Sequence, residues 1–397
     1  MPGLSAWTLG LLLSASPLCQ EEKSLPEVQD PVFEEPSWSL LEVPEVVFDG
    51  QSFATDPARL AQLRAQIDAL VHVDRPAPGY SATISWTQFA PLPEVAENVH
   101  SLLLADHRTE TSPALRELVH QGPWALPVLL EALDDRRPTS LVIGDGDWPL
   151  VLYRTSEAPI HRASPLERAV KARHPSLFTL WDPPAGSLDP EWLEDAEVER
   201  HTVTVGDLAF VALGQITNRA YHAARYQPSG LAVVNSPTSQ PELAAFLRDL
   251  WRARDRAADL FQSLLVDLYT RGEGSEGLQA GAVLRLLFYF PDQAGPIVAE
   301  RLANLEVSGD EEPLGVGLLQ AAALTNDPGV APVLCEQALH APTGSVFLAC
   351  LSPEVVRVAP ARLLERARKL RVDVWNEQDE ERMETWIDRL ERLGASR

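Results

Sequence analysis

One short pattern recurs three times along the chain and limits the folds open to it. The pattern is a proline, three small or apolar residues and a glutamate, and it occurs at residues 127–131, 296–300 and 332–336. Each copy follows a turn rich in Gly, Pro or Asp, and an amphipathic segment precedes the turn, at residues 115–120, 278–290 and 314–325. A helical hairpin buries one face only by packing against a neighbour, so three or more such units are expected to stack into one core.

This succession of helix, turn and proline-started helix resembles the HEAT-like repeat. Residues 122–133, Gly-Pro-Trp-Ala-Leu-Pro-Val-Leu-Leu-Glu-Ala-Leu, carry the resemblance best, and it covers about residues 115–134 and 277–370. We therefore expect a mainly α protein, a HEAT-like α-solenoid of antiparallel helix pairs. The resemblance implies no ligand. Residues 136–235 do not fit the repeat and are expected to form an irregular insert with one or two short strands.

Several helix starts are marked by a capping side chain directly before a proline. The capping oxygen accepts an otherwise unpaired amide N–H, and proline at the first helical position loses no hydrogen bond. Four such pairs are Asp56-Pro57, Ser112-Pro113, Ser164-Pro165 and Asp189-Pro190. Strand candidates are residues 201–205 and 231–234. A charged helix over 377–393, stopped by Gly394, is expected to cover the last repeat.

Composition divides the chain into five parts: 1–20, 21–55, 56–135, 136–235 and 236–397. We expect helical repeats in 56–135 and in 236–397, on either side of the insert. Residues 21–55 hold nine acidic side chains, one lysine and four prolines, which is typical of an extended acidic linker. Their second half also contains Trp38, Leu41, Val43 and Phe48, so this piece is expected to dock on the body as a strap.

The first twenty residues predict export. Residues 4–13 form an apolar run that is too short to span a bilayer but suits a secretory signal peptide, and small residues follow it. No Lys or Arg precedes the run, which departs from the usual signal pattern. We expect a periplasmic or extracellular protein. Free secretion and lipid anchoring at Cys19 both stay open, although Leu18 is not the small residue that an anchoring signal has before its cysteine.

Charge excludes two classes of partner. The chain has 33 Lys+Arg against 57 Asp+Glu, a formal net charge of −24 and a pI near 4.7. Nucleic acids and anionic membrane surfaces both attract clustered Lys and Arg, so neither is expected as a partner. No later stretch is apolar enough to span a membrane. A protein or peptide partner is expected instead, and the oligomeric state stays open.

Two cysteines follow the predicted signal peptide, Cys335 and Cys350, placed symmetrically about a predicted turn at 341–343. Packed helix axes lie about 8–10 Å apart, whereas a disulfide needs Cα atoms roughly 5.5 Å apart. Two buried free thiols are therefore expected, with a disulfide as the alternative in an exported protein.

A candidate binding segment lies in the insert, where the local charge reverses sign. Between residues 201 and 240 the only acid is Asp207, against Arg219 and Arg225. If 207–226 is one helix, several polar side chains share a face. Guanidinium, imidazole, amide and phenol groups together suit an anionic or hydroxyl-rich ligand. The candidate binding residues are Gln215, Asn218, Arg219, Tyr221, His222, Arg225 and Tyr226.

The alternative for this segment is structural, with Arg219 and Arg225 paired to acids elsewhere in the chain. An enzyme would use Asp207 with His201 or His222 as an acid–base pair, but no nucleophile stands at a recognisable spacing, and Ser229 lacks the context of one.

Other motifs lack the context that chemistry needs. The glycine pattern at 272–277 follows a helix where a nucleotide-binding loop follows a strand. The histidines form no His-Glu-x-x-His motif, and Asp145 and Asp147 around Gly146 are typical of a turn rather than of a calcium loop. We expect no catalytic residue, metal ion or cofactor.

The sequence favours a non-enzymatic binding or scaffold module of the cell envelope that recognises a protein or peptide partner through the solenoid groove. The alternative is an enzyme or small-ligand receptor acting on envelope carbohydrate or peptide through residues 201–226.

Overall fold

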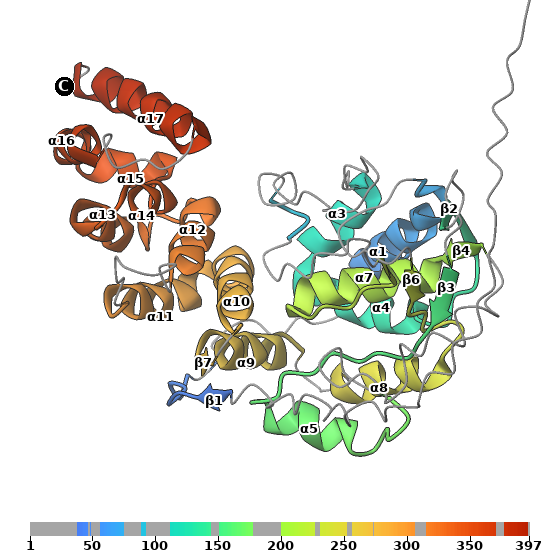
Figure 1. The fold of residues 1–397 in the computed structure, drawn as a ribbon. Helices are drawn as coiled ribbons and strands as arrows, with labels where there is room; N and C mark the ends of the chain where they lie inside the picture. The colour runs from blue at the N-terminus through green and yellow to red at the C-terminus, as the bar shows by residue number, and fades with distance from the viewer. Residues whose placement is uncertain are drawn as a thin grey trace, which may run out of the picture. The chain divides into compact units, whose positions relative to one another are not determined.

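Helices predominate in the computed structural model, and the strands are few and short (Figure 1). The expected mainly α class is confirmed. Ser37–Arg397 forms one compact unit by its contacts. The structure describes residues 38–46, 48, 56–74, 89–92, 112–143, 151–177, 200–226, 231–251, 256–272, 274–305, 315–370 and 377–395. The predicted signal peptide, most of the linker, Asp145, Asp147, the Asp189-Pro190 pair and Ser229 lie outside these residues.

One helix, α7 (Val205–Thr217), is buried along its whole length and packs against α1, α3, α4 and α9. Every residue of α7 is small, apolar or hydrogen-bonded inside the protein, which is why no face of it reaches solvent. The segment expected to be an irregular insert therefore supplies a central helix. The neighbouring elements are α1 (Pro57–Ala69), η1 (Leu70–His72), α3 (Pro113–His120), η2 (Gly122–Ala125) and α4 (Leu126–Ala132).

Short strands flank α7. The predicted strands are both present, as β4 (His201–Thr204) and β6 (Leu231–Val234). β4 pairs antiparallel with β2 (Pro138–Ile143), while β6 pairs parallel with β3 (Val151–Arg154) and antiparallel with β5 (Ala224–Tyr226). The insert thus holds five strands among its described residues, where one or two were expected. Helices α5 (Pro165–Lys171) and α8 (Pro241–Trp251) pack against each other.

The remaining helices run from α9 to α17; α9 packs against α10, and the helices that follow form two series. α10, α12, α14 and α17 contact one another in that order, and α11, α13 and α16 do the same, with α15 against α13 and α16. Cross-contacts α10–α11, α12–α13 and α16–α17 join the two series (Figure 1). Their bounds are α9 (Arg256–Leu268), α10 (Glu276–Tyr289), α11 (Pro291–Ala303), α12 (Val316–Thr325), α13 (Ala331–His340), α14 (Gly344–Ala349), α15 (Pro353–Val358), α16 (Pro360–Leu370) and α17 (Glu377–Ala395).

The helix starts predicted from a capping residue before a proline are present at all three positions that the structure describes. The Asp56 and Ser164 side chains cap α1 and α5, and α3 begins at Pro113 without a side-chain bond from its cap residue. One position was wrong. Pro296 was expected to start a helix, but α11 begins at Pro291 and contains Pro296 in its interior. At the far end, α17 continues to Ala395, past Gly394.

The described part of the strap lies against α9, α10 and the turn between them. β1 (Ser39–Leu40) pairs antiparallel with β7 (Thr270–Arg271), and the Leu41 amide donates to the Tyr269 carbonyl at 2.9 Å. The Phe48 ring packs on Phe261 and Phe290, with ring centroids 5.4 and 5.6 Å apart. Apolar contacts therefore hold this segment on the helices.

The two cysteines are buried free thiols, as expected. Cys335 lies on α13 and Cys350 directly follows α14, on the hairpin that the sequence predicted. Burial raises the pKa of the Cys350 thiol to about 12, so it stays protonated at neutral pH. Among the described helices, none has the length and hydropathy to cross a membrane.

Candidate functional site

The start of α7 is fixed by Asp207, a side chain with no solvent exposure. Thr204 and Asp207 form a capping box, in which the Thr204 amide donates to Asp207 Oδ2 at 2.9 Å and the Asp207 amide donates to the Thr204 hydroxyl at 3.2 Å. His201 Nε2 lies 3.2 Å from Asp207 Oδ2, and Ser236 Oγ donates to Oδ1 at 2.5 Å. The carboxylate is thus surrounded by hydrogen-bond partners.

The structure brings together His201 and Asp207, the pair that the enzyme alternative requires. Both are buried, and Asp207 already accepts a backbone amide and a serine hydroxyl at a helix N-terminus, where a carboxylate is stabilised. These contacts join β4, α7 and the turn after β6. A structural role in joining these elements is enough to account for the contacts of His201 and Asp207.

The other end of α7 differs from the expectation of one helix over 207–226. The helix ends at Thr217, and Asn218 adopts a left-handed conformation with φ 59°. Asparagine tolerates this region, and it ends helices there. Gly214 allows the chain to fold back, because a Cβ at this position would lie 2.6 Å from the Arg219 carbonyl oxygen. The predicted face of Gln215, Asn218, Arg219, His222 and Tyr226 therefore does not form.

Arg219 follows this turn and is buried with two acids. Its Nε donates to Glu167 on α5 at 2.6 Å, and its Nη1 donates to Asp267 on α9 at 2.6 Å. Asn218 donates to Asp267 at 2.8 Å and to the Leu278 carbonyl at 2.9 Å. Arg219 and Asn218 thereby tie α5, α7, α9 and α10 together. The structural alternative describes Arg219 better than a ligand site does.

The other candidate residues are also inside the protein where their side chains are described. Gln215 accepts from the Ala90 amide at 3.1 Å, and Tyr221 stacks on Phe210 with ring centroids 5.0 Å apart. His222 is 7% exposed. Arg225 and Tyr226 belong to β5, and their side chains lie outside the described part. Five of the seven candidate binding residues are therefore buried, and Arg225 and Tyr226 stay predictions.

Two arginines also donate hydrogen bonds to the backbone carbonyl groups at the C-terminus of α7. Arg285 Nε donates to the Gln215 carbonyl at 2.5 Å, and Arg219 Nη1 donates to the carbonyls of Thr217 and Asn218 at 3.2 and 3.0 Å. Terminal carbonyls have no partner within their helix and carry the negative end of its dipole. Burial lowers the pKa of Arg285 to about 10, so it remains a cation at neutral pH.

Glu167, Arg219 and Asp267 form a buried cluster that also includes His161, a histidine that the sequence did not single out. Thr270 Oγ1 donates to the Val266 carbonyl, so His161 Nε2, 2.8 Å from the same oxygen, is the donor in that contact. Burial, with a further effect of Arg219, lowers the pKa of His161 to about 3. Burial also outweighs Arg219 at Asp267 and raises its pKa to about 6. His161 is neutral at physiological pH.

Of the two acids in this cluster, only Asp267 could have been recognised as buried from the sequence. Asp267 interrupts the apolar run of residues 264–268, and an acid inside such a run is expected to have a buried partner. Glu167 directly follows the exposed Leu166 and gives no such signal.

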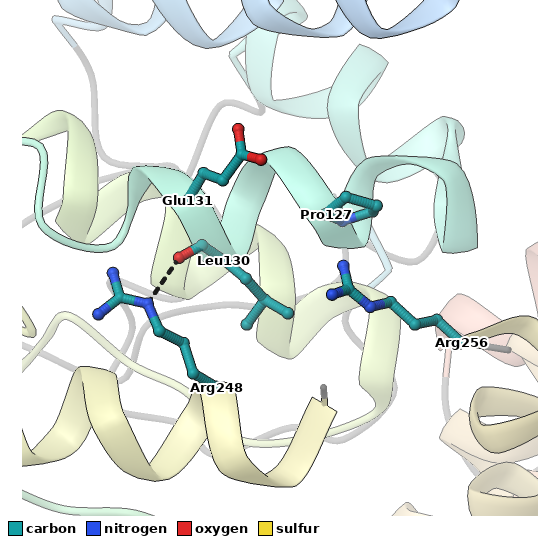
Figure 2. Close-up of a pocket in the computed structure, with 5 residues that line it drawn as sticks. All are labelled: Pro127, Leu130, Glu131, Arg248 and Arg256. Carbon is teal, nitrogen blue, oxygen red and sulfur yellow. Dashed lines mark hydrogen bonds between the residues drawn. The ribbon is translucent and has the colours of Figure 1, made fainter. Parts of the chain in front are cut away.

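A pocket of about 200 Å³ opens between α4, α8 and α9, away from this cluster (Figure 2). Pro127, Leu130, Glu131, Arg248 and Arg256 line it. Sequence reasoning missed it, although its signal is visible: four arginines fall within residues 248–256 of an otherwise acidic chain. The pocket combines guanidinium groups with an apolar wall.

No family model matches the sequence, and comparisons with curated proteins and with solved structures give no match. The described residues include no group of three or more His, Cys, Asp or Glu side chains placed to hold a metal ion.

Proposed function

We propose that the protein is a non-enzymatic binding or scaffold module that holds a protein or peptide partner on a HEAT-like solenoid formed by α9–α17. The observation that carries the proposal is the order of the helix contacts. Each helix of the series α11, α13 and α16 contacts its neighbour in the series, and a second series packs behind it. Stacked hairpins of this kind present an extended surface for a partner.

A recurring hydrogen bond supports a repeating unit. Gln337 on α13 donates to the Leu302 carbonyl near the end of α11 at 2.8 Å, and Arg366 on α16 donates to the Ala341 carbonyl after α13. Both donors directly follow a glutamate, at Glu336 and Glu365. The residue after the glutamate thus hydrogen-bonds α13 to the C-terminal end of α11, and α16 to the C-terminal end of α13.

The same register provides an exposed surface. Glu300, Glu336 and Glu365 are all exposed and occupy equivalent places on α11, α13 and α16. By contrast, ten of the fourteen residues of α10 are buried. The series α11, α13 and α16 is therefore the side on which we place the partner.

The alternative is an enzyme or small-ligand receptor that uses residues 201–226. Its geometric support is the contact between His201 and Asp207. That pair is buried and hydrogen-bonded to a helix start, which favours the binding module. Export to the cell envelope belongs to the same proposal and rests on the apolar run at residues 4–13.

Site-specific photo-crosslinking tests the proposal. Benzoylphenylalanine placed at Glu300 or Glu336 should join the full chain, expressed in its own cells, to one recurrent protein or peptide. The matched control is Leu166 on α5, which is 58% exposed and lies outside the solenoid helices. Crosslinks at Leu166 but at neither glutamate would contradict the proposed surface, and the absence of crosslinks at every position would contradict a partner.

A further inference from the structure

We propose that the pocket bounded by Pro127, Leu130, Glu131, Arg248 and Arg256 binds one carboxylate group of a partner protein or peptide (Figure 2). This inference rests on the proposed binding function and adds a second contact, outside the helices α11, α13 and α16. The recognised chemistry is a carboxylate with a short apolar stem.

Arg248 forms a fixed wall of the pocket. Its Nε donates to the Leu130 carbonyl at 3.0 Å, and its Nη2 lies 2.5 Å from Asp134 Oδ2. A guanidinium has five N–H donors, so these two contacts leave others for an incoming acceptor. Because both contacts hold the planar group in place, less side-chain entropy is lost on binding.

Of the two arginines that line the pocket, Arg248 pairs with Asp134, whereas Arg256 has no ion-pair partner among the described residues. Arg256 begins α9, and its side chain extends toward Pro127 on α4. Partial burial lowers its pKa, and only Glu131 acts in the opposite direction. Glu131 itself pairs with Arg64 at 3.2 Å, with both side chains more than half exposed. Because Glu131 already has an arginine partner, the partly desolvated guanidinium of Arg256 is suited to a second carboxylate.

The size of the pocket limits the ligand to a small group. Sites for drug-sized molecules measure roughly 300–1,000 Å³, whereas this pocket measures about 200 Å³. It fits one acidic side chain or one chain end. Pro127 and Leu130 supply apolar contact for methylene groups beside the two guanidinium groups. Both carboxylate sources share this chemistry.

Peptide titration followed by the NMR signals of arginine Nε–H groups tests the inference on the full chain. The probes are Ac-Gly-Gly-Glu-Gly-Gly-NH₂ with its glutamine counterpart, and Ac-Gly-Gly-Gly with a free or an amidated C-terminus. We expect saturable shifts at Arg248 and Arg256 with at least one carboxylate probe and with neither amide. The probe that binds identifies the source as side chain or chain end.

Variants make the result specific to the pocket. Arg256→Gln should weaken binding by about tenfold or more, because it removes the unpaired guanidinium. Glu131→Gln should strengthen binding several-fold, since it removes a competing carboxylate. Arg168→Gln, an exposed arginine on α5, is the matched control and should change nothing.

Three results would overturn the inference: no saturable shift with any carboxylate probe, equal shifts with the amide probes, or undiminished binding by Arg256→Gln. Crosslinking at Glu300 and Glu336 does not depend on this pocket. A partner that crosslinks there, together with a failed titration, would therefore refute the carboxylate pocket and leave the proposed function standing.

Discussion

At the scale of single residues, the described polar side chains of α7 and of the turn that follows it serve the fold. Arg219 lies between Glu167 and Asp267, 52 and 48 residues away in sequence. A local charge reversal indicated that Arg219 was unusual, but the sequence could not tell which of 57 acids would pair with it. Long-range pairing depends on how α5 and α9 pack, and no local pattern encodes that packing.

The pH dependence of stability follows from two buried groups with opposite effects. His161 has a folded pKa near 3 against an ordinary value of 6.5, so the unfolded chain binds its proton first and acidification below about 6.5 destabilises the protein. Asp267 has a folded pKa near 6 against 3.8, so the folded chain binds its proton first and gains stability as the pH falls from about 6 to about 4. The two contributions nearly cancel in that window.

Asp267→Asn should uncover the histidine effect. Its free energy of unfolding should fall more steeply than that of the wild type between pH 6 and pH 4, by roughly 2–3 kcal/mol over the window. His161→Gln should change the slope in the opposite direction. Urea unfolding at a series of pH values measures both, with the exposed Asp292→Asn on α11 as control. Parallel profiles for all four proteins would refute these assignments.

At the scale of elements, helix starts were predictable and the end of α7 was not. A cap followed by proline is a local signal, and α1, α3 and α5 all begin where it stands. Alternation and a short apolar run likewise predicted β4 and β6. The end of α7 instead depends on a close approach between Gly214 and the chain that follows it. Such an approach appears only once the segment has folded.

Gly214→Ala should therefore destabilise the protein. The added Cβ would lie 2.6 Å from the Arg219 carbonyl oxygen and 2.7 Å from Tyr221 Cβ, at positions that backbone geometry fixes. We expect a loss of about 1–3 kcal/mol in the free energy of unfolding.

Gly317→Ala on α12 is the matched control. Its Cβ would meet Ala280 Cβ at an ordinary 3.8 Å, so alanine should leave stability unchanged or raise it by up to about 1 kcal/mol. Equal effects of the two substitutions in denaturant unfolding would contradict the close approach at Gly214.

At the scale of the whole molecule, the helical patterns predicted the mainly α class but not what the intervening segment does. The segment 136–235 lacks the pattern, yet it contains α7, whose buried length packs against helices from both sides of it in sequence. Its polar residues resembled a binding surface because burial cannot be read from charge alone. We propose that partners contact the helices α11, α13 and α16, whereas the described side chains of residues 205–224 are buried.

Hydrogen exchange measured by mass spectrometry, with and without the crosslinked partner added as a purified protein or peptide, tests this claim most directly. Binding should slow amide exchange in α11, α13 and α16, and should leave β4 and α7 unchanged because their amides are already buried in the free protein. Slower exchange confined to residues 201–226, with no change in α11, α13 and α16, would contradict this proposal. It would support the alternative in which residues 201–226 form the functional site.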